Sequence, residues 1–294
     1  MVRHRKKIAG LLALVFSLCL LFPFASCDAG GKEEEFSVLT WNVFLGNGDG
    51  DSFATVLEEN LPDVLQMQEA SPQAYTKFIQ PFVSAHSEYF VSDIPLEGET
   101  LRTPILFNTE KFDYIDGGAE LLTDGFKPTN TKTLSWLLLE SKGCGKLLCV
   151  NFHGVKCLTK YEGYQDLTQE ERDAVEEEWH LGNARQLLEK IDQVKKEYGT
   201  QIKTVISGDC NFDSTSGAYA AIVEAGYRDA EKSAEENMQD GLRTSHSLGV
   251  EKSKAGLSID HVFSDAALYQ HRIIRTREAY FASDHCPVYV TFGL

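Results

Sequence analysis

The chain has little positive charge, few prolines and no internal repeat. Its 294 residues include 28 Lys and Arg against 44 Asp and Glu, a formal net charge of −16 at pH 7, and only 8 Pro. Tight binding of nucleic acid relies on Lys and Arg to neutralise phosphates, so this balance argues against high-affinity or processive DNA binding. The lack of repeats, low-complexity tracts and Pro/Gly/Ser-rich linkers excludes repeat architectures and predicts a single domain with a sizeable core.

One long apolar run is present, and it lies at the N-terminus. Four basic residues between positions 3 and 7 precede an apolar stretch over residues 8–25, which is the order of a secretory signal peptide. The stretch ends in Phe24-Ala25-Ser26-Cys27, which resembles a bacterial lipobox. We therefore predict that residues 1–26 are a lipoprotein signal peptide. An uncleaved anchor is the alternative, because the apolar length overlaps that of a membrane span.

Cleavage before Cys27 would make a lipid-modified Cys27 the new N-terminus and residues 27–35 a short polar tether. The protein would then work outside the cytoplasm, anchored by its lipid to a bacterial membrane, on the periplasmic face or at the cell surface. Cleavage would also remove four positive charges and no negative ones, so the mature chain would be more acidic still.

Cysteine is scarce, and its number after cleavage is odd. Cys19 lies in the predicted signal peptide and Cys27 would carry the lipid, which leaves Cys144, Cys149, Cys157, Cys210 and Cys286. An extracytoplasmic location permits disulfides, and Cys144 and Cys149 are the pair nearest in sequence, but spacing does not determine the pairing. Cys210 and Cys286 are interpreted as small buried hydrophobic residues rather than nucleophiles.

Polar side chains follow a short apolar run at Ser207-Gly208-Asp209-Cys210-Asn211. The β-branched run over residues 203–206 predicts a strand that ends near Gly208. In an extended segment Asp209 and Asn211 would share one face. A carboxylate and an amide at this place suit a divalent cation and a phosphoryl oxygen, although Asp and Asn after Gly are also ordinary turn residues.

The same design recurs at other predicted strand ends. Asn42 closes the run that begins at Phe36, Glu69 is the last side chain before the Ser71-Pro72 break, and His153 follows the strand over 146–152. Two further tracts, Ser258-Ile259-Asp260-His261 and Ser283-Asp284-His285-Cys286-Pro287-Val288, adjoin apolar runs near the C-terminus. Polar groups delivered to several strand ends predict a site for metal-assisted phosphoester chemistry.

The chain otherwise alternates short apolar runs with amphipathic stretches. We predict strands near 36–43, 63–69, 104–108, 111–116, 133–140, 146–152, 202–207, 258–264 and 286–293. We predict helices at 52–60, 72–80, 170–198 and 216–226, the third opening with the capping-box pattern Thr168-x-x-Glu171. Hairpins mixed with helix-separated strands indicate an α/β sandwich of two mixed sheets covered by helices.

Asn42, Glu69, His153, Gly208-Asp209-x-Asn211, Asp260-His261 and Ser283-Asp284-His285-x-Pro287-Val288 occur in the order and approximate spacing of the endonuclease/exonuclease/phosphatase superfamily. The chain is therefore identified as resembling that superfamily over residues 36–294. The resemblance implies the DNase I-like fold, a four-layered α/β sandwich in which two mixed β-sheets are flanked by helices.

The resemblance also implies roles for individual residues. Glu69, with Asn42 and Asp284, would bind the divalent metal, most simply Mg²⁺ or Mn²⁺. The catalytic set would be Asp209 placing the attacking water, Asn211 and His153 donating to phosphoryl oxygens, and His285 at the scissile phosphate, oriented by Asp260. Each residue has a structural alternative: a packed histidine, a turn aspartate, a surface glutamate or a loop-capping asparagine.

The expected function is that of a metal-dependent phosphodiesterase or nuclease that attacks phosphorus with an activated water, acting as a monomer. The alternatives are a sphingomyelinase-like phospholipase, a sugar-phosphate phosphatase, or a non-catalytic binding lipoprotein on the same fold. The acidic charge favours small phosphoesters and lipid headgroups. Arg185 and Gln186 depart from the family pattern by being adjacent, and the loop over 154–169, with Tyr161 and Tyr164, is the expected place of substrate selection.

Overall fold

The structure is a computed structural model that describes residues 34–92, 94, 101–122, 132–156, 163–238, 243–250 and 256–294. These residues belong to one unit, Glu33–Leu294. The predicted signal peptide, Cys27, Cys157, Tyr161 and most of the predicted tether lie outside the described residues. Within the described part of the chain, no helix combines the length and apolar character that a membrane crossing requires.

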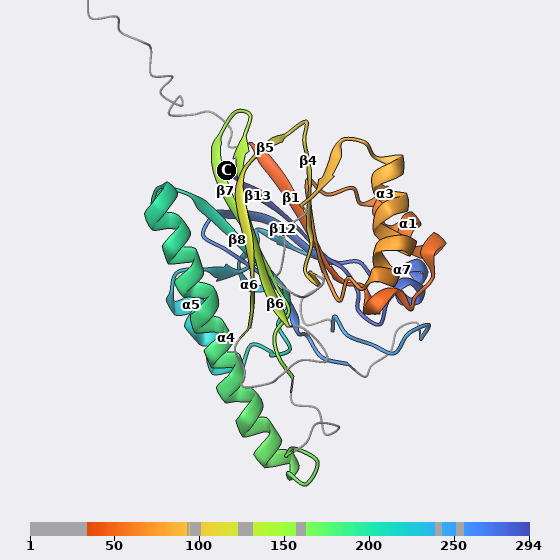
Figure 1. The fold of residues 1–294 in the computed structure, drawn as a ribbon, viewed down its shortest axis with the longest axis vertical. Coiled ribbons are helices and arrows are strands. Elements are labelled where there is room, and N and C mark those ends of the chain that lie inside the picture. Colours follow the sequence, from red (N-terminus) through yellow and green to blue (C-terminus); the bar gives the residue numbers. More distant parts are fainter. Residues whose placement is uncertain are drawn as a thin grey trace, which may run out of the picture. The chain divides into compact units, whose positions relative to one another are not determined.

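Two mixed β-sheets form the centre of the unit (Figure 1). The seven-stranded sheet has the order β10 (Glu236–Asn237), β12 (Ala267–Ile273), β13 (Val288–Gly293), β1 (Glu35–Asn42), β2 (Val64–Gln68), β4 (Ile105–Asn108) and β3 (Tyr89–Val91). The six-stranded sheet has the order β5 (Phe112–Leu121), β6 (Thr133–Ser141), β7 (Gly145–Phe152), β8 (Lys203–Asp209), β11 (Asp260–Ser264) and β9 (Arg228–Asp229). Parallel pairs, β1 with β2 and β7 with β8, sit among antiparallel ones in both sheets.

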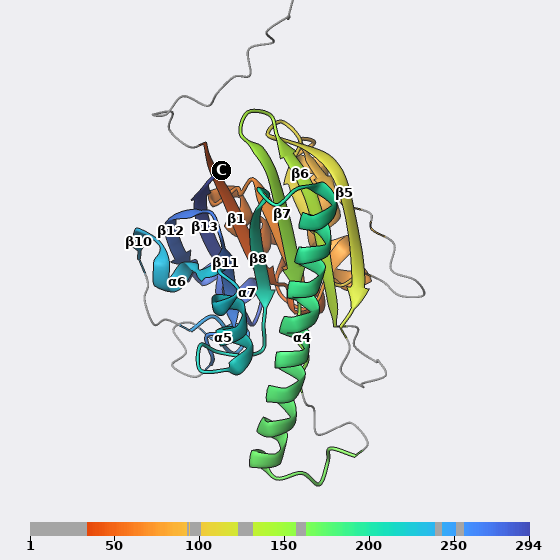
Figure 2. The same cartoon turned by 90° about the vertical axis from the view of Figure 1, so that its left-hand side faces the viewer.

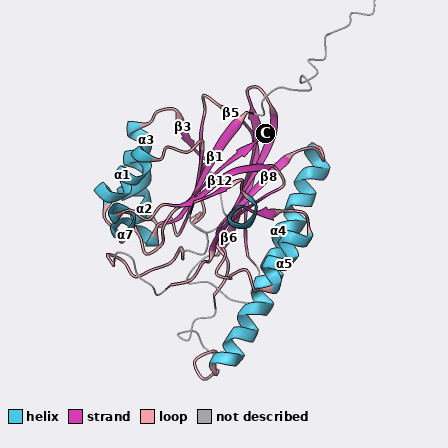
Figure 3. Ribbon diagram, turned by 180° about the vertical axis from the view of Figure 1, so that it is seen from behind, coloured by secondary structure: helices cyan, strands magenta, loops and turns pink. Residues whose placement is uncertain are grey.

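Helices cover the outer face of each sheet, which gives four layers. One group covers the seven-stranded sheet: α1 (Gly50–Glu59), α2 (Pro72–Ala74), the π-helical turn η2 (Tyr75–Ile79), α3 (Gln80–Ala85) and α7 (Arg277–Ala282). The other group, α4 (Gln169–Tyr198) and α5 (Gly217–Glu224), covers the six-stranded sheet. Figure 3 shows the two groups on opposite sides of the strands, and Figure 2 shows α4 in front of the strands that it covers. The short helices η1 (Phe44–Gly46) and α6 (Ala230–Ser233) lie in connections.

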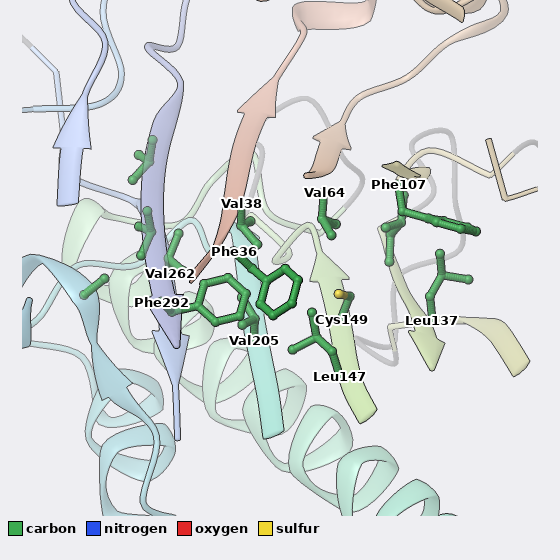
Figure 4. Close-up of a cluster of buried hydrophobic side chains, with 14 of the residues drawn as sticks. Phe36, Val38, Val64, Phe107, Leu137, Leu147, Cys149, Val205, Val262 and Phe292 are labelled. Carbon is green, nitrogen blue, oxygen red and sulfur yellow. The ribbon is translucent and has the colours of Figure 1, made fainter. Parts of the chain in front are cut away.

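Strand β1 shows why the sheets stay in the middle layers. Successive side chains of a strand point to opposite faces, and both faces of β1 are buried. Leu39 and Trp41 pack against the helices on the outer face. Phe36 and Val38 join the core between the two sheets (Figure 4). A strand that is buried on both faces has no polar face to leave in water, so each sheet must be covered twice.

The predicted fold class is confirmed, and nearly all predicted elements are present. Nine predicted strands correspond to β1, β2, β4, β5, β6, β7, β8, β11 and β13, and β5 is longer than expected. Helix α4 begins with the predicted capping box, in which Thr168 and Glu171 bond reciprocally. The hairpin of β6 and β7 pairs antiparallel as expected.

The elements that the prediction missed are short or irregular. Strand β12 contains Gln270, His271 and Arg272, and its pairing with β13 shifts register between Leu268 and Gln270, so its period-two pattern is broken. Helix α7 has six residues, too few for a helical repeat to stand out.

The described cysteines are not paired with one another. Cys149 is buried on β7, whereas Cys144 lies in the preceding turn with its Sγ 3.2 Å from Glu34 Oε2. No disulfide therefore joins the pair that is nearest in sequence. Cys210 and Cys286 are buried, as predicted, and burial raises the pKa of each thiol, which leaves both as packing residues.

Candidate active site

The predicted site residues meet at one edge of the two sheets. Asn42 is the last residue of β1 and Asp209 the last of β8, while Asp260 begins β11. Strand β11 runs antiparallel to β8, so Asp260 lies directly opposite Asp209. Glu69 follows β2, His153 follows β7, and Ser283, Asp284 and His285 precede β13. Because these strand ends share one edge, residues far apart in sequence lie side by side.

The carboxylate of Asp209 is the centre of this cluster. Asn42 donates from Nδ2 to Asp209 Oδ2 at 2.9 Å. The Nε2 atoms of His153 and His285 lie 3.4 Å and 3.8 Å from the same oxygen. Burial by itself raises the pKa of Asp209, but the positive charge of His285, helped by His153 and Lys132, outweighs it and holds that pKa well below its ordinary value. Asp209 is therefore an ionised carboxylate surrounded by donors.

His285 and Asp260 form a buried pair. His285 Nδ1 lies 2.8 Å from Asp260 Oδ2, and both side chains are buried. Burial lowers the pKa of His285, but Asp260 and Asp209 together raise it above its ordinary value. The pair leaves His285 Nε2 turned toward Asp209, so the imidazole can hold a proton at that atom.

Three contacts fix the tract that carries His285. Trp41 Nε1 donates to the His285 carbonyl at 2.7 Å. Ser283 Oγ donates to the Asn42 carbonyl at 2.6 Å and accepts from the His285 amide at 3.2 Å. The tract is thereby attached to the end of β1, which also holds Asn42.

The segment after Asp209 is not extended, which corrects the expectation that Asp209 and Asn211 share one face of a strand. Asn211 has a φ of 56°, in the left-handed region, which Asn tolerates better than most residues. Its amide nitrogen donates to Asp209 Oδ1 at 3.1 Å, and its Nδ2 donates to the Gly154 carbonyl at 2.9 Å. A turn, not a strand, places Asn211 beside Asp209.

Glycine is required where this turn meets the end of β7. A Cβ on Gly154 would lie 2.2 Å from the Cys210 carbonyl oxygen, and one on Gly208 would lie 1.8 Å from that of Phe152. Gly154 also donates from its amide to the Asp209 carbonyl at 2.9 Å. Only glycine lets the two strand ends approach this closely.

Glu69 and Asp284 supply the acidic wall of the site. Glu69 has a φ of 57° directly after β2, and its Oε1 lies 3.8 Å from His153 Nε2. Burial raises the pKa of Asp284 to about 6; the negative charge of Glu69 adds to this rise, and the positive charge of His285 reduces it. Neighbouring carboxylates that repel each other in this way are the donors that a divalent cation favours.

The donor set fits Mg²⁺ or Mn²⁺. Glu69 and Asp284 offer carboxylate oxygens, and Asn42 Oδ1, which accepts from the Phe44 amide at 3.0 Å, has a second lone pair. All three are hard oxygen ligands, which suit these ions. This assignment to Asn42, Glu69 and Asp284 remains a prediction.

A second group of donors could also hold a cation. One ligand atom from each of Asp209, Asp260 and His285 lies within 4.8 Å of the others. Asp260 Oδ1 is buried and has no hydrogen-bond partner among the residues that the structure describes. An ion bound to His285 Nδ1, however, would displace the Asp260 contact that orients the ring, so we favour the catalytic interpretation of these three residues.

The sequence prediction missed Lys132, whose Nζ contacts His153 Nε2. A lysine next to a strand is common, so the sequence carries no distinctive signal for it. The one available clue is positional: β6 begins at the edge where the antiparallel β7 ends, so the residue before β6 must lie near His153.

A layer of buried polar side chains beneath the site was also missed. Gln68 Nε2 donates to Asn151 Oδ1 at 2.7 Å and to Thr40 Oγ1 at 2.9 Å. Asn151 Nδ2 donates to the carbonyls of Met67 and Pro104 at 2.8 and 3.0 Å. These contacts join the two sheets and hold the end of β2, after which Glu69 follows.

Helix α4 supports the site from the outer side, but it does not bring Arg185 and Gln186, which depart from the family pattern, into the site. His180 Nε2 lies 2.8 Å from the Val155 carbonyl, and Asn183 Oδ1 accepts from the Val155 amide at 3.2 Å. Arg185 is exposed, and Gln186 Nε2 donates to the Leu121 carbonyl at 2.9 Å. These contacts fix the segment after His153, so the helix has a supporting role.

Comparisons with known proteins agree with this architecture. The sequence model of the Endonuclease/Exonuclease/phosphatase family matches residues 39–285. No curated protein sequence matches the chain. An endonuclease/exonuclease/phosphatase family protein from Bacteroides thetaiotaomicron is similar with a TM-score of 0.69 at 18% identity, covering 89% of this chain and 98% of its own.

Two further solved structures have the same fold. The mannosyl-6-phosphatase of Bacteroides thetaiotaomicron VPI-5482 has a TM-score of 0.68 at 19% identity, covering 88% of this chain and 100% of its own. The human Nocturnin catalytic domain with bound sulfate has a TM-score of 0.64 at 18% identity, covering 88% and 94%. The structural likeness shows the fold, and the sequence match spans every residue of the cluster around Asp209; the chain belongs to the endonuclease/exonuclease/phosphatase family.

Proposed function

We propose that the protein is a divalent-metal-dependent phosphodiesterase that attacks phosphorus with an activated water. The observation that supports this best is the arrangement around Asp209: its ionised carboxylate accepts from Asn42 at 2.9 Å and lies 3.4 Å from His153 and 3.8 Å from His285, which Asp260 orients. Members of this family are phosphoester hydrolases. Stability alone does not require five polar residues from five strand ends to meet in one cluster, since each strand could end in a loop.

The residues divide the reaction among them. Asp209 would accept a hydrogen bond from the attacking water and place its oxygen in line with phosphorus. That oxygen forms the new bond to phosphorus, the ester P–O bond breaks, and the water loses a proton while the departing oxygen gains one. Asp209 would take the proton of the water, and His285, held by Asp260, would give its Nε2 proton to the departing oxygen. Such help is typically worth about 10²- to 10⁴-fold.

Asn211 would donate to a phosphoryl oxygen from its side chain. In the structure its Nδ2 donates to the Gly154 carbonyl, and a phosphoryl oxygen carries more negative charge than that carbonyl, so it is the stronger acceptor. Asn42, Glu69 and Asp284 would hold Mg²⁺ or Mn²⁺. When bound, the ion would polarise the phosphoryl group and offset the charge that develops on it.

The expected substrate is a small phosphodiester. The net charge of −16 opposes long polyanions, whereas a small ester needs only the local site. A phosphomonoester is the second candidate, favoured by the similarity in fold to a mannosyl-6-phosphatase. A non-catalytic binding lipoprotein is less well supported, because binding alone would not require an oriented His285 beside Asp209.

We further propose that Cys27 carries a lipid and that the protein is anchored outside the cytoplasm. The described unit begins at the edge away from the site: β1 runs from Glu35 to Asn42, about 23 Å at the usual rise per residue. The Glu34 carbonyl accepts from the Leu294 amide there. A lipid anchor joined through the start of β1 is joined to the end of that strand away from the site, which favours soluble substrates over membrane lipids and weighs against a sphingomyelinase-like activity.

The test is hydrolysis by the full-length protein in the presence of Mg²⁺, Mn²⁺ or EDTA. Bis(4-nitrophenyl) phosphate, 4-nitrophenyl phosphate, plasmid DNA and sphingomyelin vesicles would be compared. We expect cleavage of the diester with Mg²⁺ or Mn²⁺ and none with EDTA. Asp209→Ala and His285→Ala should both lose this activity.

Asp192, which is exposed, and His86, whose imidazole contacts Glu58 and Glu88, provide the matched controls Asp192→Ala and His86→Ala. Both should keep full activity. Full turnover by the Asp209 and His285 variants, with folding confirmed by circular dichroism, would overturn the assignment. Cleavage of the monoester alone would select the phosphatase.

A further inference from the structure

Lys132 is held beside the site by its own backbone. It immediately precedes β6, whose first residue, Thr133, accepts from the His153 amide at 3.0 Å. On the other side, the Lys132 carbonyl accepts from the Leu122 amide at 2.9 Å. The main chain at Lys132 is therefore fixed from both neighbouring strands, and its side chain starts at the edge where the site lies.

The ammonium group lies among the reacting residues and not on the outer surface. Lys132 Nζ contacts His153 Nε2. That nitrogen is 3.4 Å from Asp209 Oδ2 and 3.8 Å from Glu69 Oε1. The positive charge of Lys132 also contributes to the lowered pKa of Asp209.

The contact with His153 constrains the chemistry of the imidazole. A lysine ammonium has only donors, so His153 Nε2 must accept. A His153 whose Nε2 accepts has no proton there to donate to a phosphate. The donor that the family resemblance assigns to His153 therefore has another source in this geometry, namely the ammonium that His153 orients.

A phosphate that enters this site meets strong repulsion. Glu69, Asp209, Asp260 and Asp284 are four carboxyl groups of one cluster. A fixed ammonium offsets part of that field whether or not a metal is bound. An anionic phosphoryl oxygen is also a stronger acceptor than a neutral imidazole, so it can take over the hydrogen bond from His153.

We propose that Lys132 is a catalytic residue whose ammonium binds a non-bridging oxygen of the scissile phosphate, with His153 as the residue that orients it. The proposal rests on the proposed phosphoester hydrolysis. The contact between Lys132 and the phosphate would position the phosphate and stabilise its charge as the ester bond breaks.

The first test is turnover of bis(4-nitrophenyl) phosphate and 4-nitrophenyl phosphate by full-length Lys132→Gln and Lys132→Arg. Removal of one such donor typically lowers kcat about 10²- to 10³-fold, and we expect that loss in Lys132→Gln. The kcat of Lys132→Arg should be at least about tenfold higher than that of Lys132→Gln, because the positive charge is kept. Lys203→Gln is the control: it removes an exposed lysine at the start of β8, the strand that ends at Asp209.

The second test measures binding and does not depend on turnover. Inorganic phosphate is titrated into each protein with Mg²⁺ present, by calorimetry. We expect Lys132→Gln to weaken phosphate binding about tenfold or more, as for loss of a charge-assisted hydrogen bond. Phosphate affinity equal to that of the wild type would overturn the proposal. If the wild type cleaves neither ester but Lys132→Gln loses phosphate binding, the proposed reaction fails and the phosphate contact stands.

A double variant separates direct contact from action through His153. Lys132→Gln is introduced into His153→Gln, and phosphate affinity and kcat are compared with those of His153→Gln alone. A further loss of about tenfold or more supports direct contact with phosphate. No further loss would show that Lys132 acts only through His153, and would overturn the proposal.

Discussion

The interior between the two sheets differs at its two ends. At the end away from the site the inward-facing residues are apolar, among them Phe36, Val38, Leu147 and Val205 (Figure 4). Continuing along the same faces toward the site, each strand changes character. Strand β1 continues with Thr40 and Asn42, β2 passes from Val64 to Gln66 and Gln68, β7 from Cys149 to Asn151 and His153, and β8 from Val205 to Ser207 and Asp209.

The contrast between the two ends explains how one sandwich can contain both a rigid apolar core and a charged site. Apolar residues at one end supply most of the burial free energy and need no specific partner. Buried amides and hydroxyls at the other end are costly unless they are hydrogen-bonded, so they fix each strand in one position. The catalytic groups then extend from strands whose positions the polar layer has already set.

The largest expected effect lies at the polar end. Asp260→Asn keeps the size and the acceptor of the side chain but removes the charge beside His285. We expect kcat for bis(4-nitrophenyl) phosphate to fall about 10²- to 10⁴-fold, the range of general acid–base help. Steady-state kinetics with Asp192→Asn as control measure it. Unchanged kcat in a folded Asp260→Asn protein would contradict the role of the pair.

The apolar end should respond in stability and not in chemistry. Phe36 is buried, and its ring lies 4.8 Å from that of Phe112, centroid to centroid. Phe36→Ala should lower the free energy of unfolding by about 3–5 kcal/mol and leave kcat of the folded protein unchanged. Urea denaturation tests it beside Phe90→Ala, since Phe90 is 47% exposed. Equal losses in both variants would show that burial between the sheets is not the cause.

A change in the polar layer should affect both properties. Asn151→Leu removes the side-chain donor to the carbonyls of Met67 and Pro104 and one of the acceptors of the Gln68 side-chain amide. We expect a loss of about 2–3 kcal/mol in unfolding free energy. Because Gln68 precedes Glu69, kcat should also fall about 10- to 100-fold.

Leu147→Val is the matched control for Asn151→Leu, on the same strand and face but at the apolar end. It should cost stability and leave kcat unchanged. If Asn151→Leu were as active as Leu147→Val, the polar layer would have no part in positioning the site.

The smallest expected effect is the pH dependence of the stability that the buried carboxylate of Asp229 contributes. Burial raises the pKa of Asp229, but His261, with Tyr219 and the Glu231 amide, lowers it below the ordinary value. The stabilisation is present above the unfolded-state pKa of about 3.9 and is lost as the pH falls through the folded-state value. Melting temperatures between pH 5 and pH 2 should thus fall less steeply in Asp229→Asn than in the wild type. Parallel curves would assign the acid sensitivity to other groups.

The elements whose sequence pattern is local were predicted correctly. The capping box of Thr168 and Glu171 and the alternating run of β1 are complete within a few residues. Strand β12 was missed because charged residues and a bulge interrupt its period. The candidate site residues were predicted for a different reason. Each is a polar residue at the end of an apolar run, and that pattern can be identified in each strand separately.

The left-handed turn at Asn211, the polar layer around Asn151 and the contact of Lys132 with His153 were not foreseen. Each depends on a partner from another strand or sheet, such as Gly154 for Asn211 or Gln68 for Asn151. An Asn or Lys has many ordinary surface roles, so its type alone does not predict such a partner.

The sequence by itself determined the layers and the candidate residues, because hydrophobic period and residue chemistry are properties of short segments. Only the tertiary structure decided which oxygen faces which nitrogen. Strand pairing brings Asp260 opposite Asp209 and Lys132 beside His153. Sheet register and packing also join residues that lie 241 positions apart in the chain, as for Ser283 and Asn42. Such contacts arise from the closure of the whole sandwich, so no single segment encodes them.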